Sequence, residues 1–129
     1  MKATVPPKKG TGGFRIKRVY APATADDGLR VLVDRLWPRG IAKEKARIDL
    51  WLKDIAPSEA LRRRFHGDPS KWPEFVAAYD SELRREPAST AVASLRQHLR
   101  SRPVTLLYAA RDETHNNAVA LKDWLEGPT

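Results

Sequence analysis

Two polar segments of the sequence hold most of the side chains that could do chemistry. The first, the early loop, is DRLWPRG (34–40), which follows an apolar run and combines a carboxylate, two guanidiniums and an indole. The second, the late turn, is ARDETHNN (110–117), which separates an apolar run from a helix-like segment. Arginine can bind phosphate or carboxylate through two parallel hydrogen bonds, and histidine can exchange a proton near neutral pH. The two segments therefore indicate a site for a small anion, with or without acid–base chemistry.

Two interpretations of the early loop stay open. In the functional one, Arg35 and Arg39 clamp a phosphate while Trp37 stacks on a base. In the structural one, Asp34 pairs with one of the arginines and Trp37 packs against the edge of a sheet, because tryptophan is more often buried than exposed to a ligand. Gly40 would allow a backbone turn that other residues resist.

The late turn also has two interpretations. Functionally, Arg111 adds a bidentate contact and His115 acts as a general acid or base. Either Asp112 or Asp34 would orient that histidine. The N–H groups at the start of the following helix would favour a negative charge nearby. Structurally, Asp112 or Thr114 caps the helix and His115 lies on the surface.

The remaining candidates are weaker. Lys53 lies beside Asp54 near a strand end and could contact a ligand, although a surface ion pair explains the two residues as well. The run Arg62–Arg64 looks like a solvated basic face of a helix. No glycine-rich phosphate loop, G-x-S-x-G elbow or H-E-x-x-H motif is present, and the three histidines lack ligand-like spacing. We therefore predict no metal site, and the sequence identifies no cofactor.

Composition narrows the possible functions. The chain has 129 residues, which suits one domain, and it has no cysteine, which excludes thiol nucleophiles and thiolate metal sites. Its net charge of +8, with arginine outnumbering lysine, favours anionic partners: a small anionic molecule, or less strongly nucleic acid. Nothing resembles a membrane helix or a signal peptide, so we expect a cytoplasmic protein that does not bind membranes. The oligomeric state is not predicted.

The elements that must position these residues alternate between strands and helices. This pattern predicts an α/β fold, with a small, mostly parallel sheet of about four strands flanked by helices and a helical insertion before the last strand. We expect a disordered basic tail over 1–13 and a single domain over 14–129. The expected strands are 14–20, 29–36, about 48–53 and 104–110. For the third of these a helix stays open, because Ile48, Trp51, Leu52 and Ile55 also match helical spacing. The expected helices are 42–46, 59–66, 70–86, 89–102 and 118–126.

The sheet would bring the two polar segments together. In open parallel sheets, ligands bind beyond the carboxyl ends of the strands. The early loop and the late turn each follow a predicted strand, so both would lie at one edge if the strands are parallel. The segment 53–58 would join them there.

The sequence also resembles a known family. The strings DDGLRVLVDRLWPRG, DLWLKDIAPS and VTLLYAARDETHNNAVAL are similar to those of the YeaO-like family of small bacterial proteins, a branch of a larger family of domains of unknown function. The resemblance covers about residues 15–125 and implies an α/β fold with no established activity.

Other branches of that larger family carry cysteines and a Cys-His-Arg triplet in the late turn. Tyr108 stands near one cysteine position and Thr114–Asn116 near the triplet, so the resemblance implies that a thiol-based mechanism cannot apply here. It raises the weight of His115, and it adds Tyr108 and Asn116 to the candidate ligand-binding residues.

Three functions follow. The leading hypothesis is an α/β domain that binds a nucleotide or phosphorylated metabolite at the carboxyl edge of its sheet. The alternatives are a nucleic-acid-binding or regulatory protein, and a non-catalytic interaction module. The first requires that the early loop and the late turn meet in one pocket.

Overall fold

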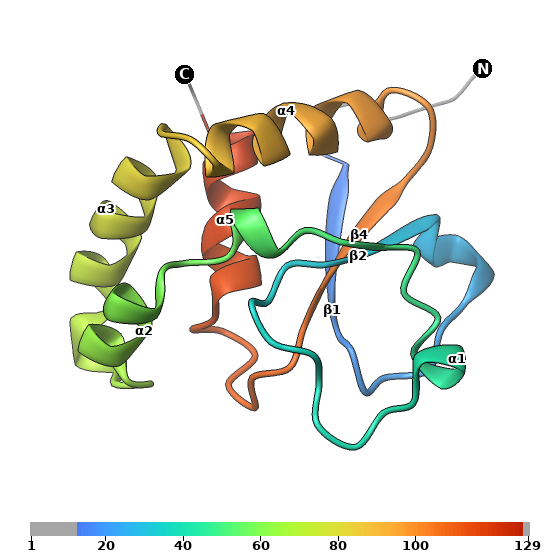
Figure 1. Ribbon diagram of the computed structural model, residues 1–129, viewed down its shortest axis with the longest axis horizontal. Helices are drawn as coiled ribbons and strands as arrows, with labels where there is room; N and C mark the ends of the chain where they lie inside the picture. Colours follow the sequence, from blue (N-terminus) through green and yellow to red (C-terminus); the bar gives the residue numbers. More distant parts are fainter. Residues whose placement is uncertain (1–12, 128–129) are drawn as a thin grey trace.

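Four parallel strands form the centre of the structure, a computed structural model that describes residues 13–127 (Figure 1). The strands are β1 (Phe14–Arg18), β2 (Leu29–Leu32), β3 (Leu50–Trp51) and β4 (Val104–Tyr108). They are ordered β1-β4-β2-β3, and every neighbouring pair is parallel. The prediction of a small parallel sheet of about four strands is confirmed.

Helices follow the strands as the apolar spacing predicts. They are α1 (Lys43–Ala46), α2 (Glu59–Phe65), α3 (Trp72–Leu83), α4 (Ala88–Leu99) and α5 (Asn117–Glu126). Helices α2, α3 and α4 form the predicted insertion before β4. The hydroxyl of Ser58 accepts the backbone N–H of Leu61 at 3.1 Å, so Ser58 caps the start of α2.

The two faces of the sheet are covered differently. Successive side chains of a strand point to opposite faces. Val31 and Leu106 therefore face the helices and belong to the main core with residues of α2 to α5. Leu32 and Leu107 face the other way and belong to a smaller cluster. Trp37, from the early loop, and Trp51, from the edge strand β3, pack against this cluster. All of β2 is buried, as its mostly apolar sequence predicts for Leu29, Val31 and Leu32.

The middle segment differs from the prediction in one respect. The short helix expected at 42–46 is present as α1. The strand expected at about 48–53 is reduced to the two residues of β3, and Lys53–Ile55 form a 3-10 turn. The side chain of Asp49 accepts the backbone N–H of Arg30 at 2.9 Å, so a carboxylate takes a place that a longer strand would fill with a carbonyl.

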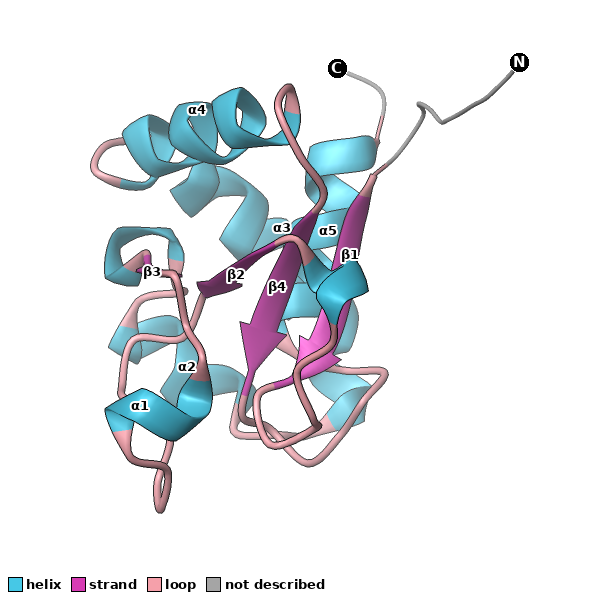
Figure 2. Ribbon diagram, turned by 90° about the vertical axis from the view of Figure 1, so that its right-hand side faces the viewer, coloured by secondary structure: helices cyan, strands magenta, loops and turns pink. Residues whose placement is uncertain are grey.

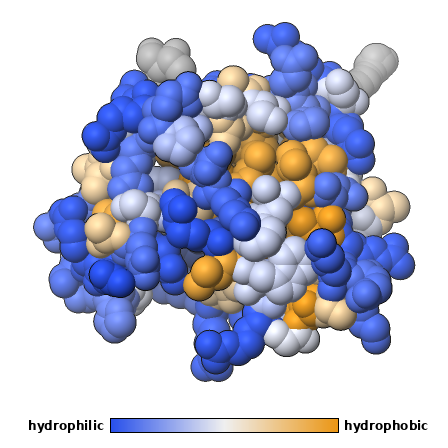
Figure 3. Space-filling view, viewed as in Figure 1, coloured by the Kyte–Doolittle hydropathy of each residue, from blue (hydrophilic) through white to orange (hydrophobic). Residues whose placement is uncertain are grey.

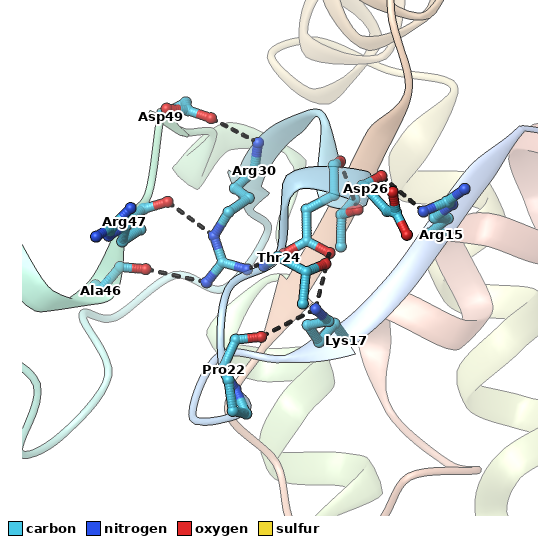
Figure 4. A network of polar contacts seen from close by, with 11 residues as sticks. Arg15, Lys17, Pro22, Thr24, Asp26, Arg30, Ala46, Arg47 and Asp49 are labelled. Carbon is cyan, nitrogen blue, oxygen red and sulfur yellow. Dashed lines mark hydrogen bonds and ion pairs between the residues drawn. The ribbon is translucent and has the colours of Figure 1, made fainter.

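An ionic network covers the amino-terminal part of the second face (Figure 4). The carboxylate of Asp27 lies 2.8 Å from the Nζ of Lys17 and 2.6 Å from the Nη1 of Arg30. Arg30 also donates to the carbonyls of Ala46 and Arg47, at 3.0 and 2.8 Å, and so holds the end of α1 over the sheet. The sequence analysis did not predict this network.

The network keeps Asp27 ionised although the residue is only 3% exposed. Burial alone would raise the pKa of this carboxyl. Hydrogen bonds from Lys17, from the backbone of Thr24 and from Arg30 outweigh the burial and hold the pKa of Asp27 well below its usual range.

Two further predictions concern the amino-terminal tail and membrane-spanning helices. The basic tail predicted for 1–13 lies, apart from Gly13, outside the described residues. Between residues 13 and 127, no helix combines the length and apolar character needed to cross a bilayer.

Candidate functional site

The early loop and the late turn meet in one cleft at the carboxyl edge of the sheet. β2 and β4 are paired neighbours, so the segments that follow them leave the sheet side by side. In Figure 2, the arrows of β1 and β4 end among the loops of this edge. The cleft has a volume of about 720 Å³, and α2 and Tyr20 complete its walls. The geometric requirement of the leading hypothesis is therefore met.

Asp34 links the segments that form the cleft. Its Oδ2 accepts the backbone N–H of Ala109 at 2.9 Å, and its Oδ1 accepts the side-chain amide of Asn117 at 3.0 Å. Burial raises the pKa of Asp34, and these two hydrogen bonds oppose that rise. The carboxylate thus joins the ends of β2 and β4 to the start of α5. Its hydrogen bonds go to these donors and not to His115.

The late turn is held by Asp112. One oxygen of this carboxylate accepts the backbone N–H groups of Thr114 and His115, at 2.9 and 3.0 Å. The other oxygen lies 3.1 Å from the Nδ1 of His115. The hydrogen bonds, with the backbone donors foremost, lower the pKa of Asp112 to about 2. Asp112, rather than Asp34, therefore orients the imidazole.

Asn116 caps α5, in place of the two residues that the sequence suggested. Its Oδ1 accepts the backbone N–H of Val119, and its Nδ2 donates to the carbonyl of Asp112, each at 2.9 Å. The residue is only 3% exposed. Asn116 lines the cleft, but its polar atoms hold the turn.

His115 stands at the wall of the cleft. Its ring packs edge-on against Trp72, with ring centroids 5.3 Å apart. Its side chain is half-buried, with Nδ1 against Asp112. No partner for its Nε2 is present among residues 13–127, so this nitrogen is the one that could exchange a proton or hydrogen bond with a ligand.

Arg35 and Trp37 line the cleft and are both engaged with the protein. Arg35 donates to the carbonyls of Ala56 and Pro57, at 3.2 and 3.3 Å. The indole N–H of Trp37 donates to the carbonyl of Ile41 at 2.8 Å, and its ring packs edge-on against Trp51. For Trp37 the packing interpretation holds. Arg35 therefore holds the segment before α2 and does not pair with Asp34.

Three other guanidiniums of the cleft have no such partners. Arg39, Arg62 and Arg111 are exposed, and their side chains make no hydrogen bond or ion pair within the part of the chain that the structure describes. In all, the lining includes five arginines and three carboxylates. Two of these carboxylates hold the late turn and the strand ends, and the third, Glu59, lies 3.1 Å from Arg63. The cleft therefore carries an excess of positive charge.

Arg62 and Arg63 are the functional candidates that sequence analysis missed. Their position in an arginine run indicated a solvated face of α2. One signal could have placed them. α2 begins directly after the segment 53–58, which was itself predicted to lie at the carboxyl edge, so its first two turns had to lie close to the ligand site.

Two predicted ligand-binding residues do not line the cleft. The Nζ of Lys53 lies 4.2 Å from the ring centroid of Trp51, at the surface. Tyr108 is buried in the main core, and burial raises the pKa of its hydroxyl. Across residues 13–127, no three His, Asp or Glu side chains gather closely enough to hold a metal ion.

Comparison with known proteins places the chain in a family. The family model DUF488-N3i, described as the inactive DUF488-N3 subclade, matches residues 13–129. "Uncharacterized protein YeaO" of Escherichia coli K12 is 46% identical over 113 residues, which cover 87% of this chain and 96% of that protein. "Uncharacterized protein Rv3073c" of Mycobacterium tuberculosis H37Rv is 42% identical over 113 residues, covering 88% and 93%. No solved structure matches. The chain thus belongs to the DUF488-N3i family, as its resemblance to YeaO-like proteins implies.

Proposed function

We propose that the protein binds a small phosphorylated ligand in the cleft and does not transform it. One observation carries the proposal: Arg39, Arg62 and Arg111 line a single cleft, and their side chains make no ion pair or hydrogen bond with a carboxylate among residues 13–127. A concave wall focuses the field of such charges and attracts an oxyanion. Arginine also offers paired donors that match the geometry of phosphate.

The polar groups around the cleft favour binding over catalysis. Asp34 and Asp112 could have served as general bases, but both hold the backbone of the strand ends and the late turn. The pKa of Asp112, at about 2, is far from that of a group that accepts a proton at neutral pH. The description of the family as an inactive subclade supports the same conclusion. An acid–base role would rest on His115 alone.

Ligand screening tests the proposal. The full chain would be titrated at low salt with inorganic phosphate, nucleoside 5′-monophosphates and sugar phosphates, with thermal unfolding as the first measurement. A ligand at about 100 times its Kd stabilises a protein by about 2.7 kcal/mol. A set of phosphorylated compounds that leaves the unfolding temperature unchanged would contradict the proposal.

Charge-removal variants locate the site. Arg39→Ala, Arg62→Ala and Arg111→Ala should each weaken binding by about tenfold to a hundredfold, because a hydrogen bond to a charged group contributes about 1.5–3 kcal/mol. The matched controls are Arg100→Ala and Arg102→Ala. These exposed arginines lie between α4 and the amino end of β4, at the opposite edge of the sheet. Equal weakening by the controls would mean that net charge, and not the cleft, binds the anion.

A further inference from the structure

A second basic pocket lies beside the cleft. It has a volume of about 250 Å³ and shares Arg63, Phe65 and Phe75 with the cleft. Because the same side chains line both, the two spaces adjoin one another across the face of α2. The pocket is completed by Leu61, Arg64, Lys71 and Glu74.

The wall between the two spaces is aromatic. The rings of Phe65 and Phe75 lie 4.7 Å apart, and Trp72 stacks on Phe75 at 5.4 Å with an interplanar angle of 19°. Phe75 is buried, whereas Phe65 at the end of α2 is only partly covered. The packing holds Phe65 in place and leaves part of it for a ligand. A partly exposed aromatic ring between basic groups is the kind of surface on which nucleic-acid bases stack.

The lining of the second pocket carries more positive than negative charge. The side chain of Arg64 makes no hydrogen bond within residues 13–127, and the Nζ of Lys71 donates to the carbonyl of Arg64 at 3.3 Å rather than to a carboxylate. Glu74 is the one acid in its lining. Figure 3 shows a predominantly hydrophilic surface on the left of this face, where α2 and α3 lie in Figure 1.

Arg63 connects the two spaces. Its ion pair with Glu59 lies on the surface, with side chains 76% and 65% exposed. Such pairs contribute little to stability. Arg63 can therefore leave Glu59 and bind a phosphate on either side of Phe65 without a large loss of protein stability.

We propose that the ligand is a dinucleotide unit that extends from the cleft into the second pocket. This rests on the proposed function, which supplies the first phosphate site at Arg39, Arg62 and Arg111. The adjoining base lies on Phe65, and the next phosphate lies at Arg64 and Lys71. A cationic surface on each side of an aromatic one matches two successive phosphates of a strand and the base that the sugar between them carries. A phosphorylated sugar would leave Phe65 and the second pocket empty.

The test compares ligand length on the full chain. Isothermal titration would measure the affinity of a nucleoside 5′-monophosphate, of the 5′-phosphorylated dinucleotide that begins with the same nucleotide, and of a longer single strand with the same 5′ end. The dinucleotide should bind at least tenfold tighter than the mononucleotide. Arg64→Ala combined with Lys71→Ala should remove that gain and leave mononucleotide binding within twofold. Phe65→Leu should weaken the mononucleotide and the dinucleotide by similar factors, because the first base lies on Phe65 in both. The double variant Arg100→Ala with Arg102→Ala is the matched control.

The outcomes separate the two proposals. If the mononucleotide binds and the dinucleotide binds no tighter, the dinucleotide inference is wrong and the proposed function stands. Equal losses in the test and control double variants would overturn the inference too. If neither nucleotide binds but inorganic phosphate or a sugar phosphate does, the dinucleotide inference is wrong and the proposed function stands; if no phosphorylated compound binds, both proposals fail. A longer strand that binds as the dinucleotide does supports a site for a free dinucleotide or a strand end, whereas further gains with length support an internal segment of a strand.

Discussion

Replacing Arg30 by methionine should destabilise the protein strongly, because its guanidinium is buried in an ion pair. The substitution keeps most of the aliphatic volume and removes the guanidinium. Arg30 is 5% exposed and its partner Asp27 is 3% exposed. The variant would leave the carboxylate of Asp27 with Lys17 as its remaining cation, and the carbonyls of Ala46 and Arg47 would lose their donor.

The size of the effect follows from this burial. Removing one partner of a buried ion pair costs about 3–5 kcal/mol, because it leaves an uncompensated charge. Lys17 remains at 2.8 Å, so we expect the lower end, about 3 kcal/mol. Native domains are stable by about 5–15 kcal/mol, so the loss would be a large share of the total.

Urea unfolding followed by circular dichroism measures this loss. If the unfolding free energy falls by about 1–3 kcal/mol per molar urea, the urea concentration at the unfolding midpoint should fall by roughly 1–3 M. Arg63→Met is the matched control, because it breaks an arginine–carboxylate pair of similar length at the surface and should change the midpoint little. The double variant Asp27→Leu with Arg30→Met should recover much of the loss. A single variant Arg30→Met within about 1 kcal/mol of the parent would refute the reasoning.

The same pair predicts a pH dependence. The pKa of Asp27 is lowered in the folded state, so its contribution is complete above the pKa of the unfolded chain, about 3.9, and is lost as the pH falls further. The stability difference between the parent and Arg30→Met should therefore stay constant from about pH 8 to 5 and shrink below about pH 4. A difference that shrinks near neutral pH would assign the effect to another group.

Three further substitutions test the framework of the site. Asp34→Ala should destabilise by about 2 kcal/mol, because Ala109 and Asn117 lose their acceptor. Burial raises the pKa of Asp34 in the folded protein, so the folded parent gains stability as this carboxyl takes up a proton in acid, and the variant does not. The difference in unfolding free energy between parent and variant, measured by denaturation, should therefore be larger at pH 4.5 than at pH 7. Ser58→Ala should cost about 1 kcal/mol through the lost cap, seen as a fall of a few degrees in Tm, whereas Ser58→Asn should restore it. Gly28→Ala should cost about 3 kcal/mol by urea unfolding, because φ is 63° and a Cβ would lie 2.2 Å from the carbonyl oxygen of Pro103; a neutral result would contradict that close approach.

Local patterns predict most of the fold because they carry its determinants. The mostly apolar runs of β2 and β4 can be buried only with both faces covered, which favours parallel strands with crossover helices. Once the strands are parallel, the early loop and the late turn must share an edge. The joint location of the two segments is therefore a consequence of the sequence pattern.

Partners distant in the sequence were not predictable in the same way. Arg35 binds the carbonyls of Ala56 and Pro57, and backbone carbonyls carry no signal in a sequence. Arg62 resembles its neighbours in the arginine run, and the run alone does not tell which of its arginines line the cleft. The burial of Arg30 depends on α1 lying over the second face, which the alternation of residues in β2 does not reveal.

The strand order has a consequence for synthesis of the chain. Within residues 13–127, β1 pairs only with β4, and β4 also separates β1 from β2. A nascent chain that ends before Val104 therefore contains β1, β2 and β3 but lacks the strand that joins the first to the other two. Contacts of such long sequence separation form slowly. The exposed hydrogen-bonding edges of β1 and β2 would meanwhile be open to chaperones or to other chains, so the sheet should be completed only after β4 has left the ribosome.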